Sequence, residues 1–360
     1  MKHVGLPSLL GLVMVTMVAL GGCRTTVAFD VVIPAEVNMS SYRTVGVFDF
    51  TEYELSRFTS GGYIEFDFFF NGYYRPIEDR LLSSEVARYM TQEMVRTLDR
   101  TGYFTIIPPG QLRSYLMNQA AFQFDAERLH RAFGLEAMII GTIEDMDTRE
   151  FVQERVESTV NTDTGERERI LRSYFIQETY LQISYSVVSA EDGRILATKR
   201  LDGRKRQETP IPRTSEMPTG WSERDFRAPS VLPLYRRIIE DFTPEIRDQL
   251  APRTVREVRR LQKDTSGDFR AERADELVKE GIYREAIRLF QGIWYEQGDF
   301  SAGYNAAVLY EALGELDQAV SLMRDVASVT GERLAFQELN RLIDAREQRL
   351  RAQKQLQEFD

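Results

Sequence analysis

Two stretches in the C-terminal third of the chain carry the same residue pattern. Small, aliphatic and aromatic residues of the first stretch recur at one constant offset in the second. This self-similarity constrains the fold more than any other feature, because repeated units of this length stack to bury a shared core. The matched positions are Ala274, Leu277, Gly281, Tyr283, Ala286 and Phe290 in the first stretch, and Ala307, Tyr310, Gly314, Leu316, Ala319 and Met323 in the second.

The spacing resembles that of tetratricopeptide repeats, whose period is about 34 residues. The resemblance implies an all-α domain of two helix pairs over 269–330, in which Ala274 and Ala286 allow close helix packing and Gly281 and Gly314 end the first helices. An unrelated helical bundle is the alternative. Repeats of this kind present a concave groove, so the resemblance also implies a protein partner that binds as an extended peptide or a helix.

Two repeats do not cover their own apolar faces, so a terminal cap is expected. Residues 331–360 supply a highly charged helix with an apolar stripe of Phe336, Leu339, Ile343 and Leu350. We predict that this helix caps the repeats, with projection as a docking arm left open. Before the repeats, the charged segment 251–268 is predicted to be a linker.

The N-terminal segment has a short basic head, an apolar run and a small-residue end at Leu20, Gly21 and Gly22 before Cys23. Residues 1–22 are therefore predicted to be a signal peptide. Their end resembles the lipobox of bacterial lipoproteins, which implies acylation of Cys23 with a diacylglycerol and palmitate. Cys23 is the only cysteine in the chain. A generic signal peptide with a chance cysteine is the alternative.

Acylation would place residues 23–43 as a tether and the rest of the chain outside the cytoplasm, anchored to the membrane through the lipid. Arg24 follows the cysteine. By resemblance to enteric lipoproteins, in which Asp at this position signals inner-membrane retention, Arg24 favours the outer membrane. The expected location is the cell envelope, facing the periplasm.

Composition argues against several classes of function. A net charge of −10 argues against nucleic-acid binding, which requires a basic face. With two histidines and one cysteine in the sequence, a His/Cys metal site is not expected, and no metal or cofactor is predicted. His130 is interpreted as a solvated or partly packed side chain. No common catalytic motif is found, so a non-enzyme is expected, although 56 acidic residues leave carboxylate-pair chemistry on wall glycan open.

The middle of the chain alternates strand and helix patterns, which predicts an α/β layer with helices on a mixed sheet. A helix is expected to begin at Ser83 or Ser84, with Val86, Met90 and Met94 on its buried face. The expected order is strand 44–50, this helix, strand 104–107, two short helices around 112–116 and 125–134, strand 136–147, a long hairpin over 170–201 and helix 234–250.

The motifs in these elements resemble the CsgG-like domain of curli-assembly lipoproteins, which is related to the penicillin-binding-protein activator LpoB. The resemblance covers about 44–250 and rests on the order of four stretches: YRTVGVFDF, LDRTGYFTIIPPGQL, EAMIIGTIEDM and YSVVSAEDGRILATKRL. It implies a non-enzymatic adaptor in envelope assembly or secretion. The alternative that it implies is an oligomeric ring or channel component, and so a homo-oligomer.

The sequence departs from this family at an aromatic insert, residues 51–83. Within it, YIEFDFFFNGYY (63–74) carries a hairpin signal at Asn71-Gly72. We expect a partly buried flap, or else a contact surface for a protein or a second copy, and insertion into a membrane is disfavoured because the return strand is short. The candidate contact residues are Phe66, Phe68, Phe69, Phe70, Tyr73 and Tyr74.

A second hairpin is predicted over 150–174, with its turn at 161–165. Neither arm has an unbroken apolar face, and a charge at the bilayer centre costs about 2–4 kcal/mol. The pore function of curli secretion lipoproteins is therefore not carried over.

Overall fold

The computed structural model describes residues 25–51, 76–117, 126–160, 165–212 and 226–357. The chain divides into two compact units. We call residues Val32–Val255 with Gln348–Asp360 the α/β unit, and residues Met1–Val31 with Arg256–Glu347 the helical unit. The division falls inside β1 (Thr26–Ile33), β7 (Arg253–Arg260) and α9 (Arg333–Gln357).

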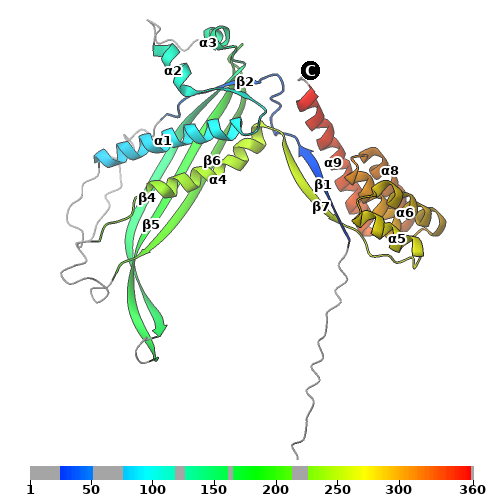
Figure 1. Ribbon diagram of the computed structural model, residues 1–360. Coiled ribbons are helices and arrows are strands. Elements are labelled where there is room, and N and C mark those ends of the chain that lie inside the picture. The colour runs from blue at the N-terminus through cyan, green and yellow to red at the C-terminus, as the bar shows by residue number, and fades with distance from the viewer. Residues whose placement is uncertain (1–24, 52–75, 118–125, 161–164, 213–225, 358–360) are drawn as a thin grey trace, which may run out of the picture. The chain divides into compact units, whose positions relative to one another are not determined.

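Among the residues described, the α/β unit is built on a five-stranded mixed sheet in the order β3-β2-β4-β5-β6 (Figure 1). β2 pairs in parallel with β3 and with β4, whereas β5 is antiparallel to both of its neighbours, β4 and β6. The predicted mixed sheet is thus confirmed. The strands are β2 (Thr44–Val47), β3 (Thr105–Ile107), β4 (Ala137–Val160), β5 (Arg167–Ser189) and β6 (Ile195–Pro210).

Helices cover both faces of this sheet, because successive strand residues point to opposite faces. Val45 and Val47 pack in one cluster with α1 (Pro76–Asp99) and α4 (Leu232–Leu250). Phe48 packs on the opposite face with the smaller helices α2 (Pro109–Met117) and α3 (Ala126–Phe133).

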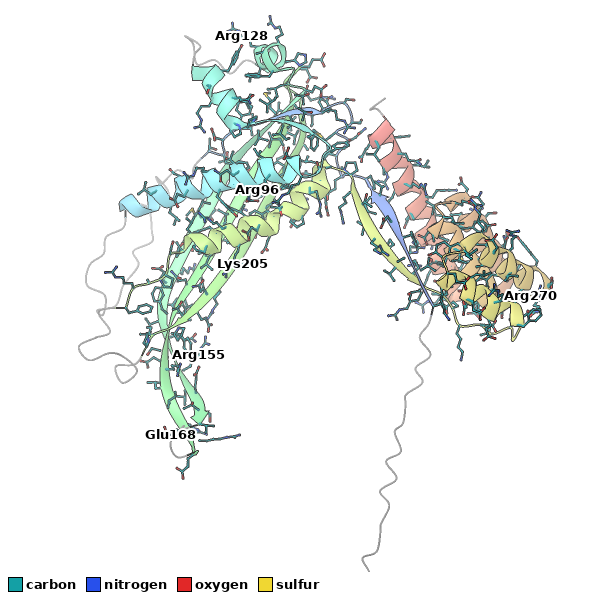
Figure 2. The ribbon with its side chains drawn as sticks, in the orientation of Figure 1. Arg96, Arg128, Arg155, Glu168, Lys205 and Arg270 are labelled. Atoms are coloured by element: carbon teal, nitrogen blue, oxygen red, sulfur yellow. The ribbon has the colours of Figure 1, made fainter. Side chains whose placement is uncertain are left out.

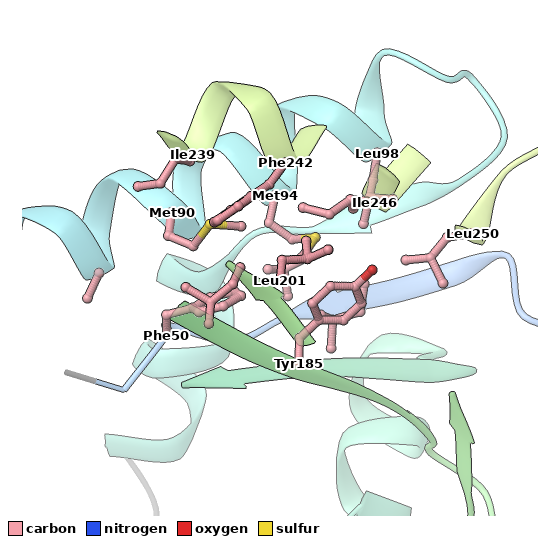
Figure 3. Packing of buried hydrophobic residues seen from close by; sticks show 14 of the residues in the cluster. Phe50, Met90, Met94, Leu98, Tyr185, Leu201, Ile239, Phe242, Ile246 and Leu250 are labelled. Atoms are coloured by element: carbon pink, nitrogen blue, oxygen red, sulfur yellow. The ribbon is translucent and has the colours of Figure 1, made fainter. Parts of the chain in front are cut away.

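The layer formed by α1 and α4 holds the main apolar core, shown in Figure 3. Met90 and Met94 of α1 and Phe242 of α4 lie over Tyr185 and Leu201 of the sheet, and all five are buried. The predicted four-residue spacing in α1 therefore marks its buried face. The predicted start of α1 was wrong: the helix begins at Pro76, because proline is well suited to the first turn. Predicted insert residues 76–83 belong to this helix.

Several predicted strands have different bounds in the structure. β2 ends at Val47 rather than at residue 50, although Phe50 is buried. β4 does not end at 147 but continues to Val160, and the hairpin predicted over 150–174 is the continuation of β4 and β5. The predicted turn between β5 and β6 is confirmed, with Gly193 at a φ of 69°.

Within the described chain, the helical unit holds five consecutive helices, which confirms that the C-terminal region is helical. They are α5 (Phe269–Lys279), α6 (Tyr283–Gln297), α7 (Phe300–Ala312), α8 (Leu316–Thr330) and α9. The starts of α6 and α8 are separated by the same number of residues as the starts of α7 and α9. Ala274 and Ala307 are separated by this number of residues too. The sequence period is therefore also the period of the helices.

The segments predicted as tether (23–43) and linker (251–268) contain paired strands. β1 and β7 form a two-stranded sheet. Two features explain why the sequence did not predict this two-stranded sheet. β7 reads RTVREVRR, in which charges mask the alternation, and its partner strand lies at the N-terminal end of the described chain, beyond the whole five-stranded sheet.

The predicted stripe on α9 was wrong in part. Leu339 and Ile343 pack against the helical core, but Phe336 and Leu350 are 48% and 53% exposed. The fully buried positions of α9 are Ala335, Glu338, Leu342, Ala352 and Gln355. The two polar residues among them, Glu338 and Gln355, are buried because Arg259 and the Ala35 backbone are their partners.

Candidate functional site

Two sets of predicted residues lie outside the part of the chain that the structure describes. They are the lipobox with its acylation site, Leu20, Gly21, Gly22 and Cys23, and the candidate aromatic contact surface, Phe66, Phe68, Phe69, Phe70, Tyr73 and Tyr74. Both remain predictions.

The predicted repeat-packing residues lie in the core of the helical unit and at its helix ends. The alanines are fully buried: Ala274, Ala286, Ala307 and Ala319. Leu277 and Phe290 are buried as well, whereas Tyr283 and Tyr310 are partly buried against the same core. Gly281 and Gly314 follow α5 and α7 with φ of 79° and 74°. These residues pack the apolar core and end the helices, and other side chains make the polar contacts of the unit.

α7 is the most enclosed helix of the unit, with buried residues on all sides. Gly303 shows how closely its neighbours approach: a Cβ there would lie 2.5 Å from Val326 Cγ2 of α8 and 3.0 Å from the Trp294 ring of α6. Three polar residues are nevertheless buried in this helix, Ser301, Asn305 and Glu311. Buried polar groups need partners, so their contacts mark the candidate site.

Asn305 binds both main-chain polar groups of Gln262. The Gln262 amide donates to Asn305 Oδ1 at 2.6 Å, and Asn305 Nδ2 donates to the Gln262 carbonyl at 2.9 Å. A side-chain amide carries an acceptor oxygen and a donor nitrogen side by side. It therefore recognises an extended backbone whatever side chain the backbone carries.

The start of α7 makes a second contact with the same segment. Thr265 Oγ1 donates to Asp299 Oδ2 at 2.6 Å, and the Thr265 amide donates to Ser301 Oγ at 3.3 Å. Asp299 is also the N-cap of α7 and accepts from the Ala302 amide at 2.9 Å. Burial alone would raise the pKa of Asp299, but these hydrogen bonds hold it below its ordinary value.

A buried ionic cluster forms the third contact. Arg341 of α9 donates to both carboxylate oxygens of Glu311, at 2.7 and 2.5 Å, and its Nη2 lies 2.6 Å from Glu338 Oε1. Arg259 of β7 binds the same carboxylate of Glu338. Glu311 and Glu338 are each only 5% exposed, so two buried carboxylates share the guanidinium groups of two partly exposed arginines.

The burial of this cluster acts on its acids and bases in opposite directions. Burial by itself raises the pKa of Glu338, but Arg341 and Arg259 outweigh it and hold that pKa below the ordinary value. Burial lowers the pKa of Arg341, and the hydrogen bonds to Glu311 and Glu338 reverse this and raise it. Glu338 and Arg341 are therefore both charged at neutral pH.

Apolar contacts complete the attachment. Leu261 and Val27 are each 1% exposed and belong to the helical core. The Leu261 amide donates to the carbonyl of Thr25 at 2.9 Å. We call the set Asp299, Ser301, Asn305, Glu311, Glu338 and Arg341 the α7–α9 face, and residues 259–265 the bound segment. The arrangement is suited to holding an extended chain.

Sequence reasoning missed every residue of this face. Two signals were present. Asn305 and Glu311 are polar residues inside the otherwise apolar α7, and Asn305 is separated from Glu338 by the same offset as Ala274 from Ala307. No local pattern indicated the pairing with residues 259–265, because these residues and their partners on α7 and α9 lie far apart in the sequence.

The α/β unit uses a related contact. Gln355, 5% exposed near the end of α9, accepts from the Ala35 amide at 2.9 Å and donates to the Ala35 carbonyl at 3.1 Å. The Tyr103 hydroxyl and Arg43 Nη2 both donate to the Gln355 carbonyl, at 2.9 and 3.0 Å. At Gln355, α9 is therefore bound within its own unit, which disfavours the open alternative that this helix projects as a docking arm.

The paired strands β4 and β5 continue beyond β6, which pairs with β5 and whose last pair is Pro210 with Tyr174. We call residues 154–160 and 167–173 the hairpin extension; Arg155 and Glu168 on it are labelled in Figure 2. Val156 and Leu171 face each other on one side and are 66% and 54% exposed. Just after β6, the amide of Ile211 donates to the carbonyl of Ser173 at 2.9 Å.

Other chemistry leaves little trace. His130 is half-buried, with its Nδ1 hydrogen-bonded to the carbonyl of Leu135. Across the described ranges, no group of three His, Cys, Asp or Glu side chains is placed to hold a metal ion. No helix among these residues is long and apolar enough to cross a bilayer.

Comparisons with known proteins found similarity among solved structures. No protein-family model and no curated protein matches the chain. The structure of the lipoprotein GNA1162 from Neisseria meningitidis matches with 13% identity over 57% of this chain and 97% of that one, at a TM-score of 0.24. Two structures of the PelC dodecamer from Paraburkholderia phytofirmans match with 10% identity over 62% and 63% of this chain and 98% and 99% of theirs, at TM-scores of 0.25.

Proposed function

We propose that the protein is a lipid-anchored, non-enzymatic adaptor of the cell envelope, facing the periplasm from the outer membrane. Its α/β unit corresponds to the CsgG-like domain, and its helical unit to tetratricopeptide-like repeats that bind an extended segment of a protein partner. The anchor is Cys23, acylated with diacylglycerol and palmitate.

The observation that carries this proposal is the two-sided contact between Asn305 and the backbone of Gln262. It supports a role in binding protein, because a buried amide that pairs with both main-chain groups holds an extended chain without regard to its side chains. The regular spacing of the helices and the lone cysteine after the apolar N-terminal run support the other two parts.

Two measurements test the proposal in cells. Labelled palmitate is expected to enter the wild-type protein and not a Cys23→Ser variant. Crosslinking followed by mass spectrometry is expected to capture a partner with the wild type and to lose it with Asn305→Asp, which keeps the acceptor and removes the donor. Asp325→Asn, an exposed position on α8, is the matched control. Equal capture by all three forms contradicts the adaptor role of the helical unit.

A point substitution is preferable to deleting residues 269–360. The deletion removes Gln355, whose contacts with Ala35, Tyr103 and Arg43 belong to the α/β unit. A truncated chain would therefore lose part of its α/β unit together with the repeats, and a missing partner would have two explanations.

The hairpin extension favours a second function, assembly of several copies into a ring or channel component. Val156 is 66% exposed on this two-stranded ribbon, and contact with a second copy would cover its apolar side chain and support the ribbon. Native mass spectrometry of the full chain in detergent is expected to show a closed oligomer that Val156→Lys disrupts, with Glu154→Lys on the same strand as the control. A monomer in both forms removes this second function.

A further inference from the structure

The bound segment makes its polar contacts with α9 and α7 at regular intervals along its own chain. Arg259 contacts Glu338 of α9, Gln262 contacts Asn305 of α7, and Thr265 contacts Ser301 and Asp299 at the start of α7. The contacts fall three residues apart. Three residues of extended chain span about 10 Å, and neighbouring helices pack about 8–10 Å apart. Arg259 and Gln262 can therefore contact two different helices, α9 and α7, and Thr265 makes a second contact with α7.

The contact residues on the two helices are equivalent in the repeat, since Asn305 and Glu338 are related by the same offset as Ala274 and Ala307. The same position of the repeat therefore contacts the extended chain on two helices. On α7, Asn305 binds its backbone, and on α9, Glu338 binds the cation of Arg259. This is the arrangement of a peptide-binding surface, and residues of the same chain fill it.

Electrostatics define what else this surface accepts. Without Arg259, the buried carboxylates of Glu311 and Glu338 would share the single guanidinium of Arg341. A buried charge without a partner costs several kcal/mol, so any replacement for the bound segment must bring a cation to the same place. Aspartate or glutamate at this position would add a third negative charge.

The guanidinium of Arg259 is also not fully hydrogen-bonded. Its Nε lies 3.9 Å from Glu311 Oε2, within ion-pair range, but it is buried and has no hydrogen-bond partner among the described residues. A buried donor without a partner is costly. A competing arginine that replaces Arg259 and whose Nε reaches an acceptor would avoid this cost, so a competitor can displace the bound segment.

We propose that residues 259–265 are an intramolecular ligand of the α7–α9 face, and that the partner is an extended, basic protein segment. Its arginine takes the place of Arg259, and the backbone three residues later takes the place of Gln262. This inference rests on the proposed function and names the partner class for it. A tethered segment has an effective concentration on the order of mM, so the wild-type face is largely closed to a free peptide.

The test uses the full chain in detergent and a fluorescent peptide with the sequence of residues 256–267, followed by fluorescence anisotropy. Arg259→Ala weakens the bound segment and leaves the face intact. It is expected to tighten peptide binding about tenfold or more, the loss of one charged hydrogen bond. Arg260→Ala is the matched control, because Arg260 is exposed and its neighbour makes the contact. It is expected to bind the peptide as the wild type does.

Two further arms test which groups recognise the peptide. A peptide with glutamate in place of the arginine that corresponds to position 259 is expected to bind the Arg259→Ala chain at least about tenfold more weakly. The double variant Arg259→Ala/Asn305→Asp is expected to lose the gain. The proposal is overturned if Arg259→Ala binds the peptide no better than Arg260→Ala.

Hydrogen exchange on the wild type gives a readout that does not depend on a variant folding. The Gln262 amide is expected to exchange more slowly than the amide of the exposed Lys263, and equal rates contradict the intramolecular contact. Failure of the adaptor role appears separately: partner capture in cells would be unchanged by Asn305→Asp while the peptide behaves as expected.

Discussion

The two units hold their chains together by different means. The inner layer of the α/β unit is apolar, with α1 and α4 packed on the sheet through side chains such as Met94 and Phe242. The helical unit has an apolar core too, but it also buries the carboxylates of Glu311 and Glu338 with their arginines. Apolar packing is insensitive to pH and salt, whereas a buried ionic cluster responds to pH and discriminates between ligands by charge.

The units share one device. In each, a buried side-chain amide pairs with both backbone groups of an extended residue, Gln355 with Ala35 and Asn305 with Gln262. Among the residues that the structure describes, the helical unit alone joins this contact to a cluster of buried carboxylates. We therefore expect the amide to supply attachment and the ionic cluster to supply selectivity.

The largest effect is expected in the apolar layer. Phe242→Ala should lower the free energy of unfolding of the α/β unit by about 4 kcal/mol, because it removes a buried aromatic ring and leaves a cavity. The loss should be the same at neutral and mildly acidic pH. Hydrogen exchange with mass spectrometry measures each unit separately. Leu81→Ala, at a site 63% exposed, is the control and should change stability by no more than about 0.5 kcal/mol.

In the helical unit, Glu338→Gln should cost about 3 kcal/mol, because it leaves two guanidinium groups with one carboxylate. Chemical denaturation of the full chain, followed by exchange in α7 and α9, measures the loss. Glu347→Gln makes the same change at an exposed site on the same helix. Equal stability of the two variants would mean that the cluster contributes nothing.

The pH dependence should separate the units further. The pKa of Glu338 is below its ordinary value of 4.5 in the folded state. Its contribution is therefore fully present above pH 4.5 and is lost as the pH falls through the depressed folded value. Stability of the helical unit, measured across this range, should fall with acid more steeply in the wild type than in Glu338→Gln. Parallel curves would refute the assignment.

Gln355→Ala should destabilise the attachment of α9 in the α/β unit by about 2 kcal/mol, because the backbone groups of the buried Ala35 lose their partners. Faster exchange of the Ala35 amide is the readout. Gln353→Ala on the exposed side of the helix is the control. If Ala35 exchanges at the same rate in both, the resemblance between the two amide contacts is only geometric.

The smallest effect is local. Asp299→Ala should cost about 1 kcal/mol, because the N-cap hydrogen bond to Ala302 is lost. Exchange at the start of α7 measures it. Asp325→Ala, at an exposed position within α8, should stay near the wild type. A loss much above that of a cap would show that Asp299 contributes mainly through Thr265.

Much of the fold followed from local patterns. The spacing of Val86, Met90 and Met94 indicated the buried face of α1, and Asp192-Gly193 indicated the turn between β5 and β6. Element ends were harder: α1 begins before the predicted cap, and β4 continues past its apolar half. Polar residues on a two-stranded ribbon do not alternate in hydrophobicity, so the period that marks a strand is absent there.

The candidate site was beyond the reach of such patterns. The face depends on pairing between positions far apart in the sequence, such as Gln262 with Asn305, and Arg259 with Glu338. The local sequence around a polar residue does not show whether its side chain is solvated or buried with a partner. Only its neighbours in space decide which.

The sequence alone determined the period of the helical unit, the alternation of strands and helices in the α/β unit and the lone cysteine at the predicted N-terminal signal, because each is a local property of the residues. The tertiary structure decided that β1 pairs with β7, that the end of α9 is bound through Gln355, and that residues 259–265 fill the α7–α9 face. These depend on contacts between distant segments, whose energy exists only once the backbone has brought both partners together.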